Sequence, residues 1–206
     1  MEKIDFKKSL STLYSAPSGK FAIVDVPVMQ FVKMDGSGDP NRDPTYKSAI
    51  EWLYSTSYAM KFAAKSGLQR DYVVPPLEGL WYADDPDDFV ARRKHLWRWT
   101  MMIMVPDFIE RTIFEAALTK ARVKLGEPPR TLRLEALAEG RCLQTLHVGS
   151  YDDEGPILSK LHNEIMPAQR LMFSGPHHEI YLSDPRKTPS VKLRTILRQP
   201  VGSIAS

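Results

Sequence analysis

The chain has 206 residues, of which 43% are hydrophobic and 26% are charged; this excludes the disordered and collagen-like classes and indicates a folded globular protein. Its 28 basic and 25 acidic residues are interspersed and give a net charge of +3. No basic stretch stands out, so we expect no nucleic-acid partner.

The single cysteine, Cys142, bears on the compartment in which the protein works. One cysteine excludes an intramolecular disulfide bond and favours a reducing compartment, so we expect a cytoplasmic protein. No apolar run approaches the roughly 20 residues needed to span a bilayer, and charges are spread through residues 1–10. We therefore expect neither export nor a membrane partner.

The first half of the chain alternates helical and β patterns. Ile50, Leu53 and Met60 recur at helical spacing, and Gly67 is expected to end their helix. Two prolines in the following segment indicate a strand at a sheet edge or with a bulge. We expect a short helix, a β-rich stretch, a long helix, a strand and an acidic loop over residues 5–14, 21–34, 44–65, 72–82 and 84–88, respectively.

The second half repeats this alternation. Trp97, Trp99, Met101 and Ile103 are expected on one face of a strand, and Asp107 is expected to cap the next helix. We predict strands over residues 97–105, 132–148 with a turn at 139–140, 177–183 and 191–198, and helices over residues 108–125 and 153–168.

Both halves therefore give a helix, a β segment, a helix and two strands, which indicates an internal repeat. Residues 36–39 (GSGD) match residues 149–152 (GSYD), and residues 77–81 (LEGLW) match residues 178–182 (HEIYL). We expect one domain over residues 1–206, made of two repeats over about 1–106 and 107–206.

Two glutamates, Glu78 and Glu179, each lie within an otherwise apolar or aromatic strand pattern. Side chains alternate along a strand, so Glu179 should share a face with Tyr181, and Glu78 should share one with Tyr82. A carboxylate among aromatic rings can attract an organic cation, or it can stay protonated and act as a general acid. The alternative is a glutamate paired with an arginine or exposed at a strand edge.

Aromatic residues cluster near these acids in the sequence. Flat rings suit planar ligands and cations, although tryptophan and tyrosine in strands also fill protein cores. The candidate ligand contacts are Glu78, Trp81, Tyr82, Trp97, Trp99, Tyr151 and Phe173, with Glu179 and Tyr181 as candidate catalytic residues.

No metal or cofactor is expected. His177 and His178 are adjacent on a strand and should point to opposite faces, and neither they nor His147 and His162 show a metal-ligand spacing. We expect structural or hydrogen-bonding roles for these histidines. No dinucleotide-binding motif or nucleophile elbow is present, and Cys142 falls in an apolar strand pattern, so covalent catalysis is not expected.

Several segments together resemble the GyrI-like proteins, in particular their stand-alone subgroup. These segments are DGSGDPN (35–41), PPLEGLWY (75–82), WRWTMMIMVPDFI (97–109), LHVGSYDDEGPIL (146–158) and HHEIYLSDPRK (177–187). The resemblance implies an α+β fold of two strand–helix–strand–strand (SHS2) modules with pseudo-twofold symmetry. It implies antiparallel sheets with helices on their outer face and a ligand cleft between the halves.

The resemblance also implies a function. Related domains of multidrug-sensing regulators hold lipophilic cations with a buried glutamate and aromatic side chains, and Glu179 and Tyr181 occupy the matching strand. We therefore expect a protein that binds small planar, lipophilic or cationic xenobiotics, for cellular protection or sensing. Some stand-alone members open the cyclopropane ring of DNA-alkylating natural products, so a hydrolase is the alternative. A second alternative is a protein-interaction module of the gyrase-inhibitor type, which would need an exposed apolar patch.

Overall fold

The computed structural model describes residues 2–85 and 92–204, and these residues form two compact units. Unit 1 holds Met1–Ser9 and Val28–Leu137, and unit 2 holds Leu10–Pro27 and Ala138–Ser206. Of the acidic loop predicted over residues 84–88, the part from residue 86 onward lies outside the described residues.

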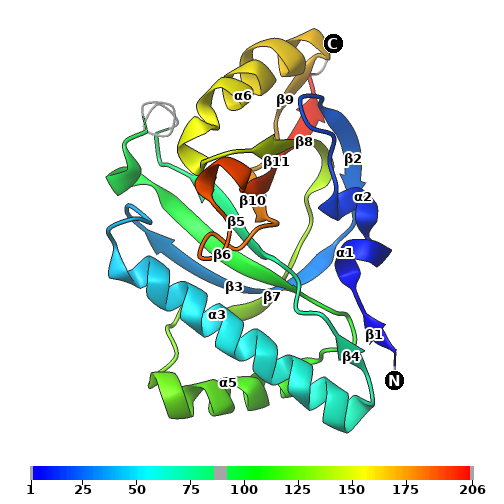
Figure 1. The fold of residues 1–206 in the computed structure, drawn as a ribbon, viewed down its shortest axis with the longest axis vertical. Coiled ribbons are helices and arrows are strands. Elements are labelled where there is room, and N and C mark those ends of the chain that lie inside the picture. Colours follow the sequence, from blue (N-terminus) through cyan, green and yellow to red (C-terminus); the bar gives the residue numbers. More distant parts are fainter. Residues whose placement is uncertain (1, 86–91, 205–206) are drawn as a thin grey trace. The chain divides into compact units, whose positions relative to one another are not determined.

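Unit 1 is built on an antiparallel sheet in which β5, β6, β3 and β7 lie side by side in that order (Figure 1). Trp81 on β5 is paired with Trp99 on β6, which is paired in turn with Gly36 on β3. These three positions therefore share one face of the sheet. The strands are β3 (Met29–Ser37), β5 (Leu77–Tyr82), β6 (Arg98–Val105) and β7 (Arg133–Leu137).

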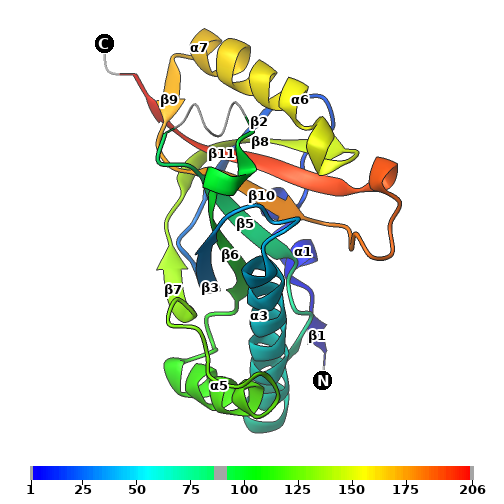
Figure 2. The same cartoon turned by 90° about the vertical axis from the view of Figure 1, so that its left-hand side faces the viewer.

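Two helices, α3 (Pro44–Ala63) and α5 (Arg111–Leu125), pack against each other beside this sheet (Figures 1 and 2). Helix α3 starts where predicted, because Pro44 fits the first helical position and the Asp43 carboxylate accepts a hydrogen bond from the Thr45 N–H. It continues into a π-turn, η1 (Ala64–Leu68), and ends at Gln69, which has a φ of 54°. The prediction that Gly67 ends this helix is therefore wrong.

Helix α5 begins three residues later than predicted, and Asp107 does not cap it. The Ile109 N–H donates to the Pro106 carbonyl in a turn that buries Ile109 completely. The residue that precedes the helix is Glu110, whose side chain makes no capping hydrogen bond. Burial of an apolar side chain thus overrides a favourable capping residue at this position.

The remaining elements of unit 1 are short. The predicted strand over residues 72–82 is interrupted at Pro75 and Pro76, because proline has no N–H to donate to a ladder. Its first piece, β4 (Asp71–Tyr72), pairs in parallel with β1 (Lys3–Ile4). The helix predicted over residues 5–14 is broken at Leu10 into α1 (Phe6–Ser9) in unit 1 and α2 (Ser11–Tyr14) in unit 2. A 3-10 turn, η2 (Lys94–Leu96), precedes β6.

In unit 2, the antiparallel strands β2, β8, β11 and β10 lie side by side in that order, and β9 pairs with the far end of β11. The strand predicted over residues 132–148 is interrupted, as expected, but the break lies at residues 138–139, and Gly140 is the first residue of β8. The strands of unit 2 are β2 (Ala22–Val26), β8 (Gly140–Val148), β9 (Leu171–Phe173), β10 (His177–Tyr181) and β11 (Arg194–Ser203).

The helix predicted over residues 153–168 begins two residues later, at Gly155, and runs to Ala168 with a π-turn at its centre. Pro167 has no N–H to continue the α-helical ladder, and the Met166 N–H donates to the Leu161 carbonyl across the π-turn. The helical elements of unit 2 are α2, η3 (Tyr151–Asp153), α6 (Gly155–Lys160), η4 (Leu161–Ile165), α7 (Met166–Ala168) and η5 (Ser190–Lys192).

A small apolar core joins this helical segment to the sheet of unit 2. Leu161 and Met166 pack with Leu143 of β8, Leu171 of β9 and Val201 of β11. The face of the sheet that carries Leu143 is therefore the one that the helical segment covers (Figure 2).

The α+β class and the antiparallel sheets predicted from the resemblance are confirmed. The chain order is β3, α3, β4, β5 and β6 in unit 1, and β8, the α6–α7 segment, β9, β10 and β11 in unit 2. The duplicated SHS2 modules, the pseudo-twofold axis, the helices on an outer face, the cleft between the halves and the boundary near residue 106 stay predictions. Among the described residues, no helix combines the length and apolarity that crossing a membrane requires.

Candidate ligand-binding site

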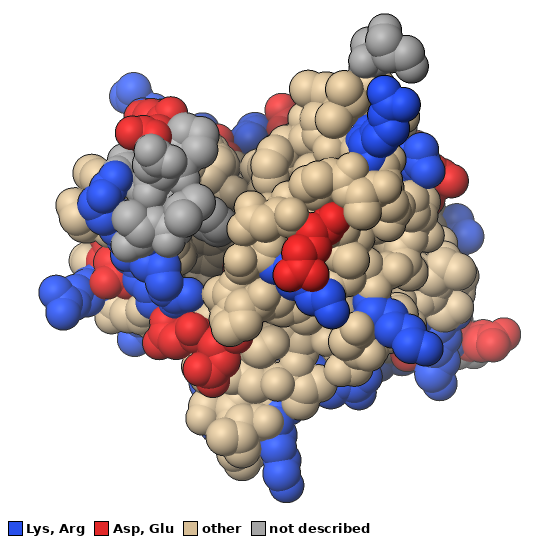
Figure 3. Space-filling model, turned by 90° about the horizontal axis from the view of Figure 1, so that it is seen from above, with Lys and Arg blue, Asp and Glu red and all other residues tan. Residues whose placement is uncertain are grey.

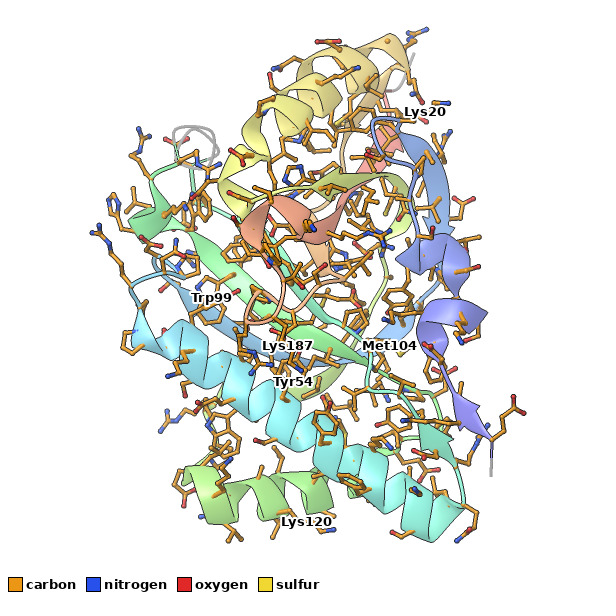
Figure 4. All side chains as sticks on the ribbon, in the orientation of Figure 1. Lys20, Tyr54, Trp99, Met104, Lys120 and Lys187 are labelled. Carbon is orange, nitrogen blue, oxygen red and sulfur yellow. The ribbon has the colours of Figure 1, made fainter. Side chains whose placement is uncertain are left out.

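Three of the predicted ligand contacts, Trp81, Trp97 and Trp99, lie together in unit 1. The Trp81 and Trp97 rings meet edge to face with their centroids 5.8 Å apart. Tyr46, from the first turn of α3, contacts both Trp81 at 6.0 Å and Trp99 at 5.2 Å. These rings therefore form one cluster on the α3 side of the sheet, and Trp99 lies on β6 next to the first turns of α3 (Figure 4).

Trp99 belongs to the core of this cluster. Its six-membered ring lies on the backbone of Gly36, where an added Cβ would be only 2.1 Å from Trp99 Cη2. The side chain is fully buried, and its Nε1 has no hydrogen-bond partner among the described residues. The burial of Trp99 favours a role in the protein core over a role as a ligand contact. Trp97, in contrast, is partly exposed.

Glu78 and Tyr82 lie on the other face of the same strand. The pairing of β5 with β6 is regular from Leu77 to Tyr82, so side chains alternate without a bulge. Trp81 points to the α3 side, and Glu78 and Tyr82 consequently point away from it. Glu78 is 1% exposed and Tyr82 is 37% exposed. The structure therefore places Glu78 on the opposite face of β5 from Trp81.

The second group of predicted site residues lies in unit 2. The Tyr181 hydroxyl donates a hydrogen bond of 2.7 Å to Glu179 Oε2. Tyr151, in the 3-10 turn η3, meets the Tyr181 ring edge to face with centroids 5.6 Å apart. Ser150 holds that turn, because its hydroxyl accepts from the Asp152 N–H at 3.1 Å. One carboxylate and two phenol rings thus form a compact group.

Two histidines, His177 and His162, extend this group. His177 Nε2 lies 3.6 Å from Glu179 Oε1. The His162 ring, on η4, packs edgewise on Phe173 at 4.9 Å. Burial, together with the charge of His177, lowers the pKa of His162 to about 4. The structural or hydrogen-bonding roles expected for these histidines stay predictions. Alternation in the HHEIY pattern predicts that His177 shares a strand face with Glu179, but no pattern predicts the contact of His162 with Phe173.

The two glutamates are not equivalent. Glu179 is paired with Leu197 on β11, which is paired with Thr145 on β8, two residues from Leu143. Glu179 therefore shares the sheet face covered by the α6–α7 segment. Glu78, in contrast, points away from α3. Glu78 and Glu179 occupy matching positions in residues 77–81 and 178–182. Their carboxylates nevertheless point to different sides relative to the helices of their units.

A buried ionic network lies on the opposite face of β10. Glu139 Oε1 is 2.8 Å from His178 Nδ1, and Glu139 Oε2 accepts from Arg198 Nη1 at 3.2 Å. Arg198 also donates to the Leu13 carbonyl at 2.6 Å and to Gln144 Oε1 at 3.2 Å. Burial alone would raise the pKa of Glu139, but His178 and Arg198 outweigh it and lower the pKa to about 2. The network holds β10 on the face opposite Glu179. No pattern in the sequence predicted these ion pairs.

Comparison with known proteins identifies the family. Residues 20–201 match the GyrI-like small molecule binding domain. The chain belongs to the GyrI-like family. Among curated proteins, none matches this GyrI-like chain.

Solved structures agree with this assignment. An uncharacterized conserved protein from Listeria innocua has 36% identity and a TM-score of 0.88, over 97% of this chain and 100% of its own. A structure described as a hydrolase from Listeria innocua has 36% identity and a TM-score of 0.82, with the same coverage. The EcmrR C-terminal domain has 12% identity and a TM-score of 0.57, over 90% of this chain and 98% of its own, and shows the fold alone.

The chemistry available to this GyrI-like domain follows from its side chains. No group of three histidine, cysteine or acidic residues within the described ranges could hold a metal ion. Burial raises the pKa of the Cys142 thiol to about 12, so this side chain is a poor nucleophile near neutral pH. Basic and acidic side chains are interspersed on the face shown in Figure 3. What the domain offers is aromatic surface, the Glu179 carboxyl group and the Tyr181 phenol.

Proposed function

We propose that this GyrI-like domain binds small planar, lipophilic or cationic molecules foreign to the cell, with Glu179, Tyr181 and Tyr151 as the central contacts. The observation that carries the proposal is the hydrogen bond from Tyr181 to Glu179 beside the Tyr151 ring. The Glu179 side chain is 12% exposed, so its carboxyl group is largely desolvated.

The arrangement suits a cation with a flat ring system. A carboxylate with one oxygen bonded to Tyr181 can direct the other oxygen to a positive charge, and a charge in a desolvated site is weakly screened. Tyrosine faces add cation–π attraction of about 0.5–2 kcal/mol. Trp81, Trp97, Trp99, Tyr82, Glu78 and Phe173 stay predictions as ligand contacts. Binding in the cytoplasm, for protection or sensing, is part of the proposal.

The test is a fluorescence and thermal-shift titration with ethidium, a planar cation, and with pyrene, a planar neutral compound. We expect Glu179→Gln to weaken ethidium binding about tenfold, because one charge–charge attraction is lost in a poorly solvated site. Pyrene binding should change little. Glu164→Gln, at an exposed position of η4, is the matched control and should bind both compounds as the wild type does. Equal ethidium affinity in wild type and Glu179→Gln would contradict the proposal.

A second candidate function is hydrolysis in the same site. Two observations favour it: the Tyr181–Glu179 hydrogen bond, which can pass a proton, and a relative with 36% identity that is described as a hydrolase. The substrate would carry a cyclopropane ring conjugated to a carbonyl group, as in DNA-alkylating natural products. Proton transfer of this kind contributes about 100-fold to 10,000-fold.

The proposed reaction adds one water to the substrate. The phenol of Tyr181, or the protonated carboxyl group of Glu179, protonates the carbonyl oxygen as a C–C bond of the ring breaks. The water oxygen bonds to the ring carbon released by that cleavage, and the proton that this water loses goes to the Glu179 carboxylate. If Tyr181 was the acid, Glu179 then passes a proton to the Tyr181 phenolate along their hydrogen bond. The protein ends unchanged, and the product is heavier than the substrate by one water.

Mass spectrometry of ligand recovered from the protein tests this second function. We expect a cyclopropane-bearing compound to gain the mass of water with wild type but not with Tyr181→Phe, which keeps the aromatic ring and lacks the acidic hydroxyl. Recovery of unchanged compound from wild type would overturn hydrolysis and leave binding alone. The protein-interaction function weighed from the sequence stays a prediction.

A further inference from the structure

His147 lies next to the turn that carries Tyr151. It is the last residue but one of β8 and is 8% exposed. Its partner on β11 is Thr195, which is paired in turn with Tyr181 on β10. Paired residues of neighbouring strands share a face of the sheet, so the side chains of His147 and Tyr181 point to the same side. Neither the family match nor the relatives assign a role to His147.

The chain turns immediately after β8, and the His147 ring packs against that turn. Gly149 has a φ of 146°, a value that favours glycine, and its N–H donates to the Leu193 carbonyl at 2.9 Å. A Cβ added at Gly149 would lie 3.2 Å from His147 Nε2 and 3.3 Å from His147 Cε1. The absence of a side chain at Gly149 therefore leaves room for the imidazole ring.

The imidazole also forms a hydrogen bond to the turn. His147 Nε2 lies 2.9 Å from the Ser150 carbonyl oxygen, and because a carbonyl oxygen only accepts, Nε2 is assigned the proton. The same oxygen accepts from the Asp153 N–H at 3.0 Å, the bond that closes the 3-10 turn η3. His147 thus ties the first carbonyl of η3 to β8.

This carbonyl belongs to the peptide unit that joins Ser150 to Tyr151. The hydrogen bond from His147 consequently orients the backbone from which the Tyr151 ring projects. That ring meets the Tyr181 ring edge to face, with centroids 5.6 Å apart. A change at His147 should therefore be felt at Tyr151 first.

We propose that His147 is a positioning residue for ligand binding, which holds the η3 turn so that the Tyr151 ring stays against Tyr181. A ring that is already in place when the ligand arrives loses less conformational freedom on binding, and this raises the affinity. His147 acts through Tyr151. The inference rests on the proposed function, in which Tyr151 contacts the ligand.

A double-mutant cycle between residues 147 and 151 tests the inference. Fluorescence titration gives the ethidium affinities of wild type, His147→Asn, Tyr151→Ala and the double variant. Asparagine keeps a polar amide, but its side chain is too short to bring an N–H to the Ser150 carbonyl. We expect His147→Asn to lower the ethidium affinity about fivefold and Tyr151→Ala to lower it about tenfold. The double variant should bind as Tyr151→Ala does.

Two further variants separate the hydrogen bond from general effects. His147→Gln is the conservative variant, because its longer amide brings an N–H to the position of Nε2, and it should bind ethidium within about twofold of wild type. His95→Asn, at an exposed position of η2, is the matched control and should bind as the wild type does. If urea denaturation shows that His147→Asn is unfolded, Ser150→Ala replaces it in the cycle, because it removes the hydroxyl that accepts from the Asp152 N–H in the same turn.

Three results would overturn the inference. The first is wild-type ethidium affinity in the variant that loosens the turn, and the second is affinity in His147→Gln as low as in His147→Asn. The third is a further loss when His147→Asn is added to Tyr151→Ala, because His147 would then act through other groups. Any of these, with ethidium binding still weakened by Glu179→Gln, would leave the proposed function standing. If Glu179→Gln had no effect, the proposed function itself would fail.

Discussion

At the residue scale, the Trp99 ring leaves no space for a side chain at Gly36. Trp99 is paired with Gly36 across β3 and β6, and three of its ring carbons lie within 2.6 Å of the position of an added Cβ. Because Trp99 is fully buried and also contacts Tyr46, its ring has no free direction in which to move. The absence of a side chain at residue 36 is therefore a packing requirement of the aromatic cluster.

Gly36→Ala should accordingly lower the free energy of unfolding by about 3 kcal/mol, the upper part of the usual cost of overpacking. Urea denaturation measures it. Gly67→Ala is the control, since nothing lies within 4 Å of an added Cβ there, and its stability should change by less than about 1 kcal/mol. Equal stabilities for the two variants would contradict this account of Trp99.

At the element scale, alternate side chains of β10 lie in two different environments. His178 faces the buried network with Glu139 and Arg198, and the neighbouring Glu179 faces the candidate site. Alternation along the strand couples the two, because a shift of β10 that broke the network would also move the carboxyl group of Glu179. We therefore propose that the network holds the Glu179 carboxyl group in position.

Glu139→Gln should therefore lower the free energy of unfolding by about 3 kcal/mol at pH 7, since it leaves the Arg198 charge buried with a weaker partner. The sign of the pH dependence follows from the lowered pKa. The native value is about 2 and the ordinary value is 4.5, so the stabilisation is complete above about pH 4.5 and is lost as the pH falls toward 2. Denaturation at several pH values should show this loss in wild type and not in Glu139→Gln; the same slope in both would contradict it.

The sequence predicted elements better than contacts. Helix α3 begins at Pro44 as expected, because its signals, Asp43 and Pro44, are local. Alternation also placed Tyr181 on the face of Glu179. The pairing of Tyr46 with Trp81, or of Glu139 with Arg198, joins residues from distant segments, and no periodicity encodes which segments meet. The start of α5 was also predicted wrongly, because the burial of Ile109, which depends on tertiary packing, sets where this helix begins.

At the scale of the whole molecule, the family gives the fold and a general function. The match over residues 20–201, and relatives with 36% identity over 97% of the chain, make this a GyrI-like small-molecule-binding domain. The sequence segments that resemble the GyrI-like proteins extend over both units. We propose that a few side chains in unit 2 decide which ligand is bound and whether it is changed.

The most direct test of the central claim is a crystal structure of the protein with ethidium bound. We expect the ring system against Tyr151 and Tyr181, with the positive charge toward the carboxyl group of Glu179. A matched crystal of Glu179→Gln should show weaker or absent ligand density at that position. Ethidium found elsewhere, with Glu179 and Tyr181 still bonded only to each other, would contradict the account.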